Sequence, residues 1–251
     1  MSEERELLKK RFLELSRKAY EGSYFTFSDF LGLAEQSALK EVLRTLPSRI
    51  TLFGGASGAE RVMVRFGDAE EIGYELPFPI ACLKIAPRAP KFADRLTHRD
   101  FLGALLNLGI EREVLGDIVI RENVGYLFAK DTIAEFITDS LSRVKHTDVT
   151  VSTVEQLPNG ELYKTEIKKI QANGERLDAV VAKVFSISRD DASTLFKKHL
   201  IFADGREIES VSYIPKVGEV ISVRGYGRFI YRGYETLTKK GKKNIEVELY
   251  V

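Results

Sequence analysis

Six predicted elements between residues 80 and 154 follow an order that few small folds share. The hydrophobic patterns predict a strand, a helix, two strands, a second helix and a last strand. In chain order these elements are Ile80–Ile85, His98–Leu108, Asp117–Arg121, Val124–Ala129, Thr132–Val144 and Asp148–Val154. This is the order of a ferredoxin-like, or RRM-like, domain. We expect such a domain over residues 75–160.

The middle domain has two interpretations, because RNA-recognition domains share its topology. Tyr126 and Phe128 are the only aromatic residues on the predicted central strand. The residues around them lack the basic and aromatic pattern of sheets that stack RNA bases. Core packing is the preferred interpretation, and RNA contact through the sheet stays open.

The segment before this domain, residues 1–74, combines helical and strand patterns. Apolar residues recur at three- and four-residue steps from Glu3 to Tyr20, which predicts a helix. A second helical pattern begins after Ser28 and ends before Pro47. Two short strands around a glycine-rich turn follow, at Ile50–Phe53 and Arg61–Phe66.

The last third of the chain, residues 161–251, predicts a small α/β module after a turn-rich break at Gln156–Gly160 and a connecting strand at Ile167–Ile170. One helix covers Arg176–Phe185, and Ser188 is placed as the N-cap of a second. Short strands are predicted at Ile201, Val211, Val220–Val223, Phe229–Tyr231 and Ile245–Leu249. With the two preceding segments, this gives an α+β chain of three parts.

Positive charge gathers near the C-terminal end although the formal net charge is only +1. The segment from Arg224 to Lys243 holds seven Lys and Arg residues against one acidic residue, Glu235. A local concentration of cations is what binding to a polyanion requires.

Several classes of protein are disfavoured by residue types that the chain lacks. One cysteine, Cys82, excludes an intramolecular disulfide framework, and three histidines give no zinc-ligand spacing. We expect no metal and no cofactor. The charged N-terminus and the lack of a long apolar run disfavour secretion and membrane spanning. The expected location is the cytoplasm.

The C-terminal module resembles the RNA-binding domain named after ribosomal protein S-four. The matching residues are Arg176-Leu177-Asp178, Ser188-Arg189, Ala192, Leu195 and Ile201 to Gly205. The resemblance implies RNA binding through Arg176, Ser188, Arg189, Lys197 and Lys198. His199 stands where the domain usually has a helix-ending glycine, and we expect it to adopt the left-handed conformation. Asp204-Gly205 keeps the chemistry of a tight turn.

A second basic segment follows this module, with arginines separated by glycines. Guanidinium groups beside glycines can approach phosphate closely, and aromatic rings can stack on unpaired bases. The residues predicted to bind RNA here are Arg224, Tyr226, Arg228, Phe229 and Arg232. The alternative is a tight β-turn with ordinary surface charge, followed by a basic tail.

Over about two thirds of its length the chain resembles the YlmH proteins. The resemblance is carried by Phe53-Gly54-Gly55, Gly58 to Arg61, Leu96 to Ile110, Arg112-Glu113, Gly116 to Ile118 and Arg224 to Phe229. It implies a non-catalytic protein of the ribosome that binds large-subunit rRNA and tRNA, with a part in the rescue and quality control of stalled translation. We expect a monomer, with Arg61, His98, Arg99 and Arg112 as secondary RNA or interdomain contacts.

Three motifs point to enzymes, and each has a simpler structural explanation. His98-Arg99-Asp100 matches a kinase loop without the other kinase elements, and capping by Thr97 and Asp100 is favoured. The Phe53–Gly58 segment lacks the ending of a phosphate loop. The residues around Asp178 resemble the start of a pseudouridine synthase motif, but a helix follows directly. An RNA-modifying enzyme and a cell-division-associated interaction protein remain the alternative functions.

Overall fold

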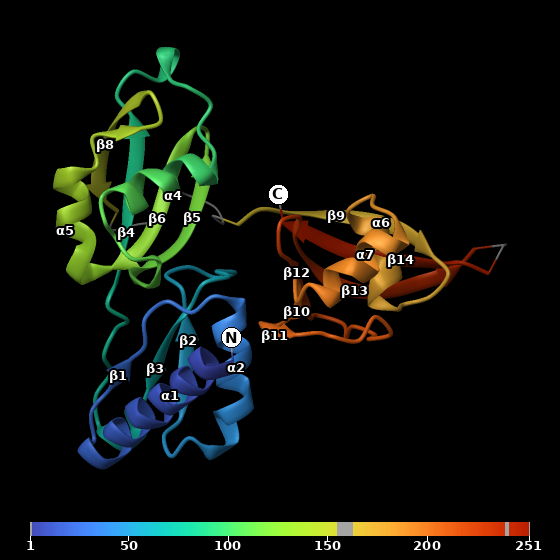
Figure 1. Cartoon of the computed structure of the whole chain (residues 1–251), viewed down its shortest axis with the longest axis horizontal. Helices are drawn as coiled ribbons and strands as arrows, with labels where there is room; N and C mark the ends of the chain where they lie inside the picture. Colours follow the sequence, from blue (N-terminus) through green and yellow to red (C-terminus); the bar gives the residue numbers. More distant parts are fainter. Residues whose placement is uncertain (1, 155–162, 239–240, 251) are drawn as a thin grey trace. The chain divides into compact units, whose positions relative to one another are not determined.

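The computed structural model describes residues 2–154, 163–238 and 241–250, and the chain divides into two compact units (Figure 1). Unit 1 comprises residues 1–163 and unit 2 comprises residues 164–251. Unit 1 holds both the N-terminal segment and the ferredoxin-like domain. The sequence boundaries at residues 74 and 160 stay a prediction.

The N-terminal segment packs two helices against a three-stranded sheet ordered β1-β3-β2. Its core includes Phe12, Leu39 and Phe66. Its elements are α1 (Ser2–Gly22), β1 (Thr26–Phe27), α2 (Leu33–Val42), η1 (Leu43–Thr45), β2 (Ile50–Phe53), β3 (Met63–Phe66) and α3 (Ala69–Ile72). The helix predicted after Ser28 begins at Leu33, with Gly32 as its N-cap. The Ser28 hydroxyl instead accepts from the backbone N–H of Val64, which draws this stretch onto β3.

The second part of unit 1 has the ferredoxin-like topology predicted from the element order. Its five-stranded sheet is ordered β5-β6-β4-β8-β7, with antiparallel neighbours throughout. The elements are β4 (Ile80–Pro87), η2 (Pro90–Phe92), α4 (His98–Asn107), η3 (Arg112–Val114), β5 (Leu115–Arg121), β6 (Val124–Lys130), α5 (Asp131–Ser140), β7 (Arg143–Val144) and β8 (Thr147–Thr153). The second helix is shorter than predicted, because the backbone turns extended at Leu141 and Val144 pairs with β8.

The two faces of this sheet are both covered, by different parts of unit 1. Helices α4 and α5 cover one face and share a core with it. On the other face Tyr126 and Phe128 pack against Phe30 and Met63 of the N-terminal segment and are 8% and 1% exposed. A Cβ atom on Gly55 would lie 2.2 Å from the Phe128 ring, so the N-terminal segment packs closely against this face of the sheet. The preferred interpretation, core packing, is therefore the correct one for these two aromatics.

Unit 2 is a six-stranded antiparallel sheet, ordered β11-β10-β12-β13-β14-β9, with α6 and α7 packed on one face (Figure 1). The elements are β9 (Thr165–Ala172), α6 (Leu177–Val184), α7 (Arg189–Lys197), β10 (Ile201–Ala203), β11 (Arg206–Glu207), β12 (Val220–Val223), β13 (Gly227–Leu237) and β14 (Lys243–Tyr250). Residues 167–170 thus belong to an edge strand that pairs along its length with β14.

Two sequence predictions in unit 2 need correction, and one turn lies outside the described residues. Val211 lies in a turn, where its carbonyl faces the N-terminus of α6 instead of joining the sheet. Lys243, predicted to lie in a basic tail, instead begins β14 and pairs with Leu237 of β13. Lys239 and Lys240, and the predicted turn at Gln156–Gly160, fall among the residues that are not described.

The tight turns of unit 2 follow the predicted chemistry. His199 ends α7 with a φ angle of 56°, in the left-handed region that histidine tolerates. Asp204 and Gly205 also have positive φ angles, 46° and 73°, and join β10 to β11 as a two-residue hairpin turn. The helix-ending turn and the hairpin turn are both confirmed.

Candidate nucleic-acid interface

A buried carboxylate at the start of α6 positions two arginines. Nε of Arg176 lies 3.2 Å from Asp178 Oδ1, and Nε of Arg189 lies 2.9 Å from Asp178 Oδ2. The Asp178 side chain is 3% exposed, whereas those of Arg176 and Arg189 are 47% and 54% exposed. Both guanidinium groups therefore keep donors free toward solvent while one buried anion fixes their positions.

The electrostatics of Asp178 show which effect dominates at this cluster. Burial raises the pKa of its carboxyl, but the hydrogen bond and charge of Arg189 and the charge of Arg176 outweigh burial. The pKa is therefore lowered, and the group is an anion at neutral pH. A carboxylate bound by two guanidinium groups is a poor nucleophile, which disfavours the pseudouridine synthase interpretation of the motif around Asp178.

The two arginines open onto a cavity of about 460 Å³. Four of its lining residues are cationic, and none is acidic. The cationic lining residues are Arg176, Lys183, Arg189 and Lys242, and polar ones include Gln171, Asn173 and Ser188. Its chemistry suits an anion with several oxygen acceptors, such as a phosphate group.

Ser188 has the capping role predicted from the sequence. Its hydroxyl oxygen accepts from the backbone N–H of Asp191 at 3.0 Å and so begins α7. The cap places Arg189 at the first position of the helix, beside Asp178. Ser188 thus shapes the cavity by starting the helix as well as by lining it.

Lys197 and Lys198 lie at the other end of α7, away from the cavity. Eight residues separate Arg189 from Lys197, which is about 12 Å along a helix axis. Both lysines are exposed, and neither lines the cavity. The sequence predicted RNA binding by all four cations, but Arg176 and Arg189 line the cavity, whereas Lys197 and Lys198 lie at the C-terminal end of α7.

The arginines of β13 point to the sheet face opposite the helices. Phe229 and Tyr231 are buried in the core beneath α6 and α7. Because strand side chains alternate, Arg228 and Arg232 project from the far face. The Arg228 guanidinium stacks 4.1 Å from the Tyr250 ring centroid, and Arg232 is paired with Glu248. The second basic segment therefore forms a surface separate from the cavity.

The remaining residues of this segment differ in what they can contact. The Arg224 guanidinium lies 5.1 Å from the ring centroid of Phe202, and Tyr226 is 46% exposed with its ring beside Phe185. Phe229 is 0% exposed, so the prediction that it stacks on an RNA base is wrong. The sequence contained a signal for this, because Phe229 directly follows Arg228, and neighbouring residues of a strand point to opposite faces of the sheet.

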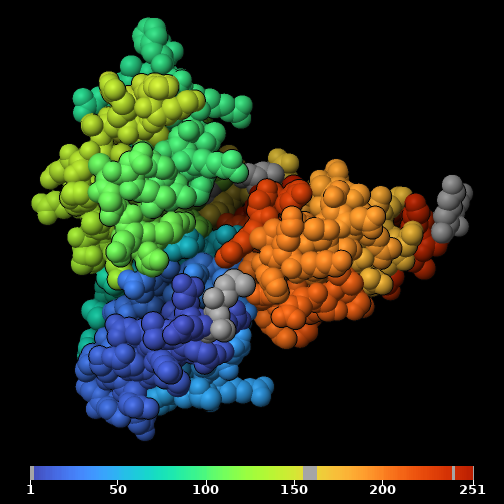
Figure 2. All heavy atoms as spheres, in the orientation of Figure 1, coloured from blue at the N-terminus to red at the C-terminus, as the bar shows by residue number. Residues whose placement is uncertain are grey.

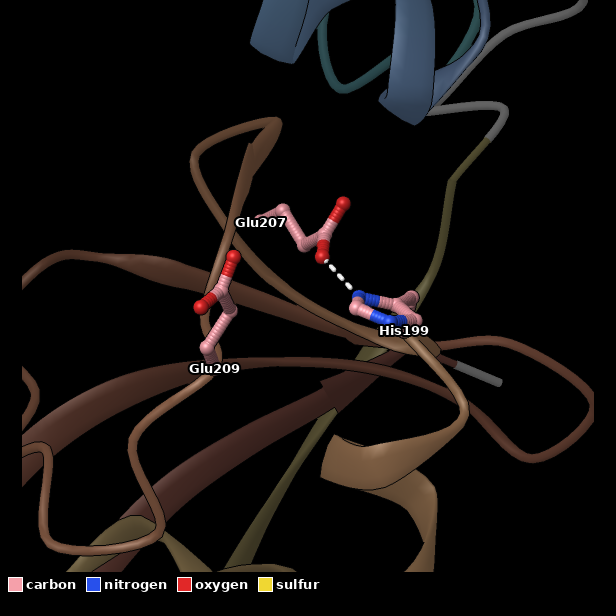
Figure 3. Close-up of side chains that lie close together, drawn as sticks. All are labelled: His199, Glu207 and Glu209. Carbon is pink, nitrogen blue, oxygen red and sulfur yellow. Dashed lines mark hydrogen bonds and ion pairs between the residues drawn. The ribbon is translucent and has the colours of Figure 1, made fainter. Parts of the chain in front are cut away.

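One group of described residues could hold a metal ion. The ligand atoms of His199, Glu207 and Glu209 lie within 4.8 Å of one another (Figure 3). His199 Nδ1 is paired with Glu207, while His199 and Glu209 are both exposed to water. The left-handed turn at His199 creates this proximity, which sequence spacing did not predict.

In unit 1, two of the predicted secondary residues form internal contacts. Arg61 donates from Nε to the Leu115 carbonyl at 2.8 Å and from its terminal nitrogen to the carbonyls of Phe30 and Arg112. Arg112 donates to the carbonyls of Leu115 and Gly116. Burial, with the nearby charge of Arg61, lowers the pKa of Arg112 to about 10. Arg61 thus joins the N-terminal segment to the ferredoxin-like part, whereas Arg112 binds the backbone at the start of β5.

The other two secondary residues begin α4 and are exposed. Asp100 Oδ2 accepts from the backbone N–H and the hydroxyl of Thr97, at 2.8 and 2.7 Å. The predicted capping box is therefore confirmed. His98 and Arg99 lie at the helix start and are exposed, although partial burial and the charge of Arg112 lower the pKa of the His98 imidazole.

Three residues at this site have roles that the sequence did not predict. Asp178 was predicted as part of the S-four-type motif but not as the anion that positions the arginines, and Lys183 and Lys242 were not predicted to line the cavity. Lys183 lies seven residues after Arg176. This spacing is about two helical turns and predicts that both residues share one face of the helix. Lys242 has no such signal, because the length of the β13–β14 hairpin sets its position.

Comparison with known proteins identifies the chain's relatives. Residues 75–157 match the family model described as "Putative RNA-binding domain in YlmH". A protein of Bacillus subtilis strain 168, named "Ribosome-associated protein quality control protein P2", is 29% identical over 240 residues, covering 94% of this chain and 91% of that protein.

A solved structure, "Cell division protein ylmH from Streptococcus pneumoniae", is 22% identical with a TM-score of 0.49, and the match covers 60% of this chain and 91% of that one. Among the described helices, none has the length and apolar character needed to span a bilayer. The match to a domain described as RNA-binding and the similarity to a protein described as ribosome-associated support the predicted non-enzymatic role. These similarities confirm the resemblance to the YlmH proteins predicted from the sequence, over residues 75–157 for the family model and over 94% of this chain for the Bacillus relative.

Proposed function

We propose that this chain is a non-catalytic RNA-binding protein that associates with the ribosome in the cytoplasm. Its RNA ligands are large-subunit rRNA and tRNA, and its role is the rescue and quality control of stalled translation. The quality-control name of the Bacillus relative and the RNA-binding domain named for residues 75–157 support this proposal.

The observation that carries the proposal is the cationic cavity of unit 2. Arg176 and Arg189 are fixed by a buried carboxylate and face outward with Lys183 and Lys242 beside them. Fixed cations lose little conformational freedom on binding, so they are suited to a phosphate in folded RNA. We assign this cavity as the main phosphate contact of an S-four-type module over residues 161–251.

The test is the salt dependence of binding to purified large ribosomal subunits and to tRNA. Counterion release makes the logarithm of affinity fall linearly with the logarithm of salt concentration. The double variant Arg176→Ala/Arg189→Ala should bind more weakly, with a salt slope smaller by about 1 for each lost phosphate contact. Arg49→Ala is a matched control, since Arg49 is an exposed arginine of unit 1 paired with Asp68.

Two results would overturn the proposal. One is an affinity that does not change between low and moderate salt for the unmodified chain. The other is a modified nucleoside, found by mass analysis of RNA after incubation with the protein, which would favour an enzyme. Retention of protein partners after nuclease treatment would favour a cell-division-associated interaction protein instead.

A further inference from the structure

The most exposed large apolar side chain among the described residues is Phe92, which is 89% exposed. It ends the short helix η2, in the connection between β4 and α4. This segment, near residue 90 on the colour bar, projects from unit 1 (Figures 1 and 2). An aromatic ring held almost entirely in water adds little buried apolar area to the fold, so its whole face is accessible to a ligand.

The connection is fixed close to Phe92 by side chains from two other turns. Asn123 accepts from the backbone N–H of Leu96 at 2.8 Å and donates to the Asp94 carbonyl at 2.9 Å. The backbone N–H of Asp94 donates to Thr147 Oγ1 at 2.9 Å. The turn of η2 is closed by Phe92 N–H donating to the Ala89 carbonyl at 3.0 Å. The ring is therefore presented by an ordered support, which lowers the entropy lost on binding.

Cationic residues flank Phe92 in the sequence. Residues 88–99 contain four Lys and Arg residues against one Asp. Lys91, Arg95 and Arg99 are exposed, and no side-chain hydrogen bond or ion pair joins any of them to another described residue. Arg88 is anchored, because its Nε donates to the Val149 carbonyl at 3.1 Å. Exposed cations without an internal anion are available to phosphates.

The usual RNA surface of an RRM-like sheet is not available in this protein. Phe128, on the central strand, is buried under the N-terminal segment, and Tyr126 beside it is 8% exposed. An RNA contact by this domain must therefore use another surface. An outward aromatic flanked by cations is the combination that proteins use for unpaired bases, since every base has a π-face and carries a phosphate.

We propose that the β4–α4 connection is a second RNA contact, in which Phe92 stacks on an unpaired base while Lys91 and Arg95 bind flanking phosphates. This inference rests on the RNA-binding function proposed above. It assigns unit 1 a ligand class, single-stranded loop or bulge RNA, and a surface that does not depend on the cavity of unit 2.

A single tryptophan provides a direct test, because the chain contains none. In full-length Phe92→Trp, an RNA hairpin with an unpaired loop should quench the fluorescence, whereas a fully paired duplex of the same composition should not. Phe136→Trp is the matched control. Phe136 is 45% exposed in the same domain, on helix α5, where Glu135 and Asp139 are its charged neighbours in sequence.

Affinity measurements separate stacking from apolar contact. Phe92→Ala should weaken binding of the looped RNA about 5- to 150-fold, Phe92→Tyr should keep it, and Phe92→Leu should not restore it. Lys91→Glu/Arg95→Glu should also weaken binding, whereas Lys10→Glu, an exposed lysine of α1, should not. Because all of these substitutions are at exposed positions, they should leave the melting temperature unchanged, and thermal unfolding of the same samples tests this.

The outcomes distinguish this inference from the proposed function. If Phe92→Ala and Lys91→Glu/Arg95→Glu bind the looped RNA normally while Arg176→Ala/Arg189→Ala does not, the second contact is wrong and the RNA-binding function stands. If the unmodified chain binds neither the looped RNA nor the paired duplex, the proposed RNA-binding function fails together with the second contact. Loss of binding to phosphatidylserine vesicles in Phe92→Ala, with RNA binding unchanged, would assign the loop to a membrane surface and overturn the inference.

Discussion

Arg189 and Asp178 form an ion pair across the two helices of unit 2, with Nε of the arginine 2.9 Å from Oδ2 of the aspartate. The carboxylate is buried, and the guanidinium is half exposed. The buried carboxylate therefore fixes the position of the exposed guanidinium group. The pair therefore links the packing of α6 and α7 to the surface that faces the cavity.

The first prediction separates positioning from net charge. Asp178→Asn removes a negative charge beside a cationic cavity, so simple electrostatics would tighten RNA binding. We expect weaker binding, because both arginines lose their fixed positions, together with a loss of about 1–2 kcal/mol in unfolding free energy. Asp190→Asn, which removes an exposed charge next to Arg189, is the control and should bind no more weakly than the unmodified chain. Tighter binding by Asp178→Asn would contradict the positioning role.

The second prediction concerns acid stability. The folded-state pKa of Asp178 lies below its ordinary value of about 3.9. Its ion pairs therefore stabilise unit 2 above about pH 4, and this contribution is lost as pH falls through the lower folded-state pKa. Hydrogen exchange of α6 amides between about pH 5 and pH 3 should show a smaller loss of protection in Asp178→Asn than in the unmodified chain. Parallel curves would contradict the prediction.

The third prediction follows from the two faces of the unit 2 sheet. Arg228 lies on the face opposite α6 and α7, so it does not share a phosphate with Arg176 or Arg189. The losses in binding free energy from Arg228→Ala and Arg176→Ala/Arg189→Ala should add to within about 0.5 kcal/mol. A larger coupling, measured with large ribosomal subunits in a double-mutant cycle, would indicate one continuous contact.

The fourth prediction separates two aromatic residues of the glycine-arginine segment. Phe229 is buried, so Phe229→Leu should lower the unfolding free energy by about 1 kcal/mol and leave RNA affinity unchanged. Tyr226 is 46% exposed, so Tyr226→Leu should have little effect on stability and should weaken RNA binding. Thermal unfolding and RNA titration of both variants test this contrast. Weakened RNA binding by fully folded Phe229→Leu would restore its stacking role.

The fifth prediction uses Cys82, the single cysteine of the chain. Burial raises the pKa of its thiol to about 11, so roughly one thiol in a thousand is ionised at pH 8. Alkylation by iodoacetamide should be slow in the folded protein and rise about tenfold per pH unit up to about pH 10. The unfolded chain is the reference and should react more than a hundredfold faster at pH 8. Rapid labelling of folded protein would show that this sheet face is not covered.

The sequence by itself determined the features that depend on neighbouring residues along the chain. Hydrophobic periodicity gave α1, β2, α4 and β12 nearly to the residue, and the element order gave the ferredoxin-like topology. Turn chemistry placed the left-handed His199 and the Asp204-Gly205 hairpin turn. Local backbone preferences and capping groups act within a few residues, so these patterns are visible in one dimension.

The tertiary structure alone decided which side chains share a surface. Strand pairing sent Arg228 to the face opposite Arg189, the N-terminal segment covered Phe128, and the β13–β14 hairpin brought Lys242 to the cavity. Each of these depends on contacts between residues far apart in the chain, where burial of apolar surface sets the arrangement. Charge content therefore predicted a class of ligand, whereas the number and location of the candidate surfaces required the fold.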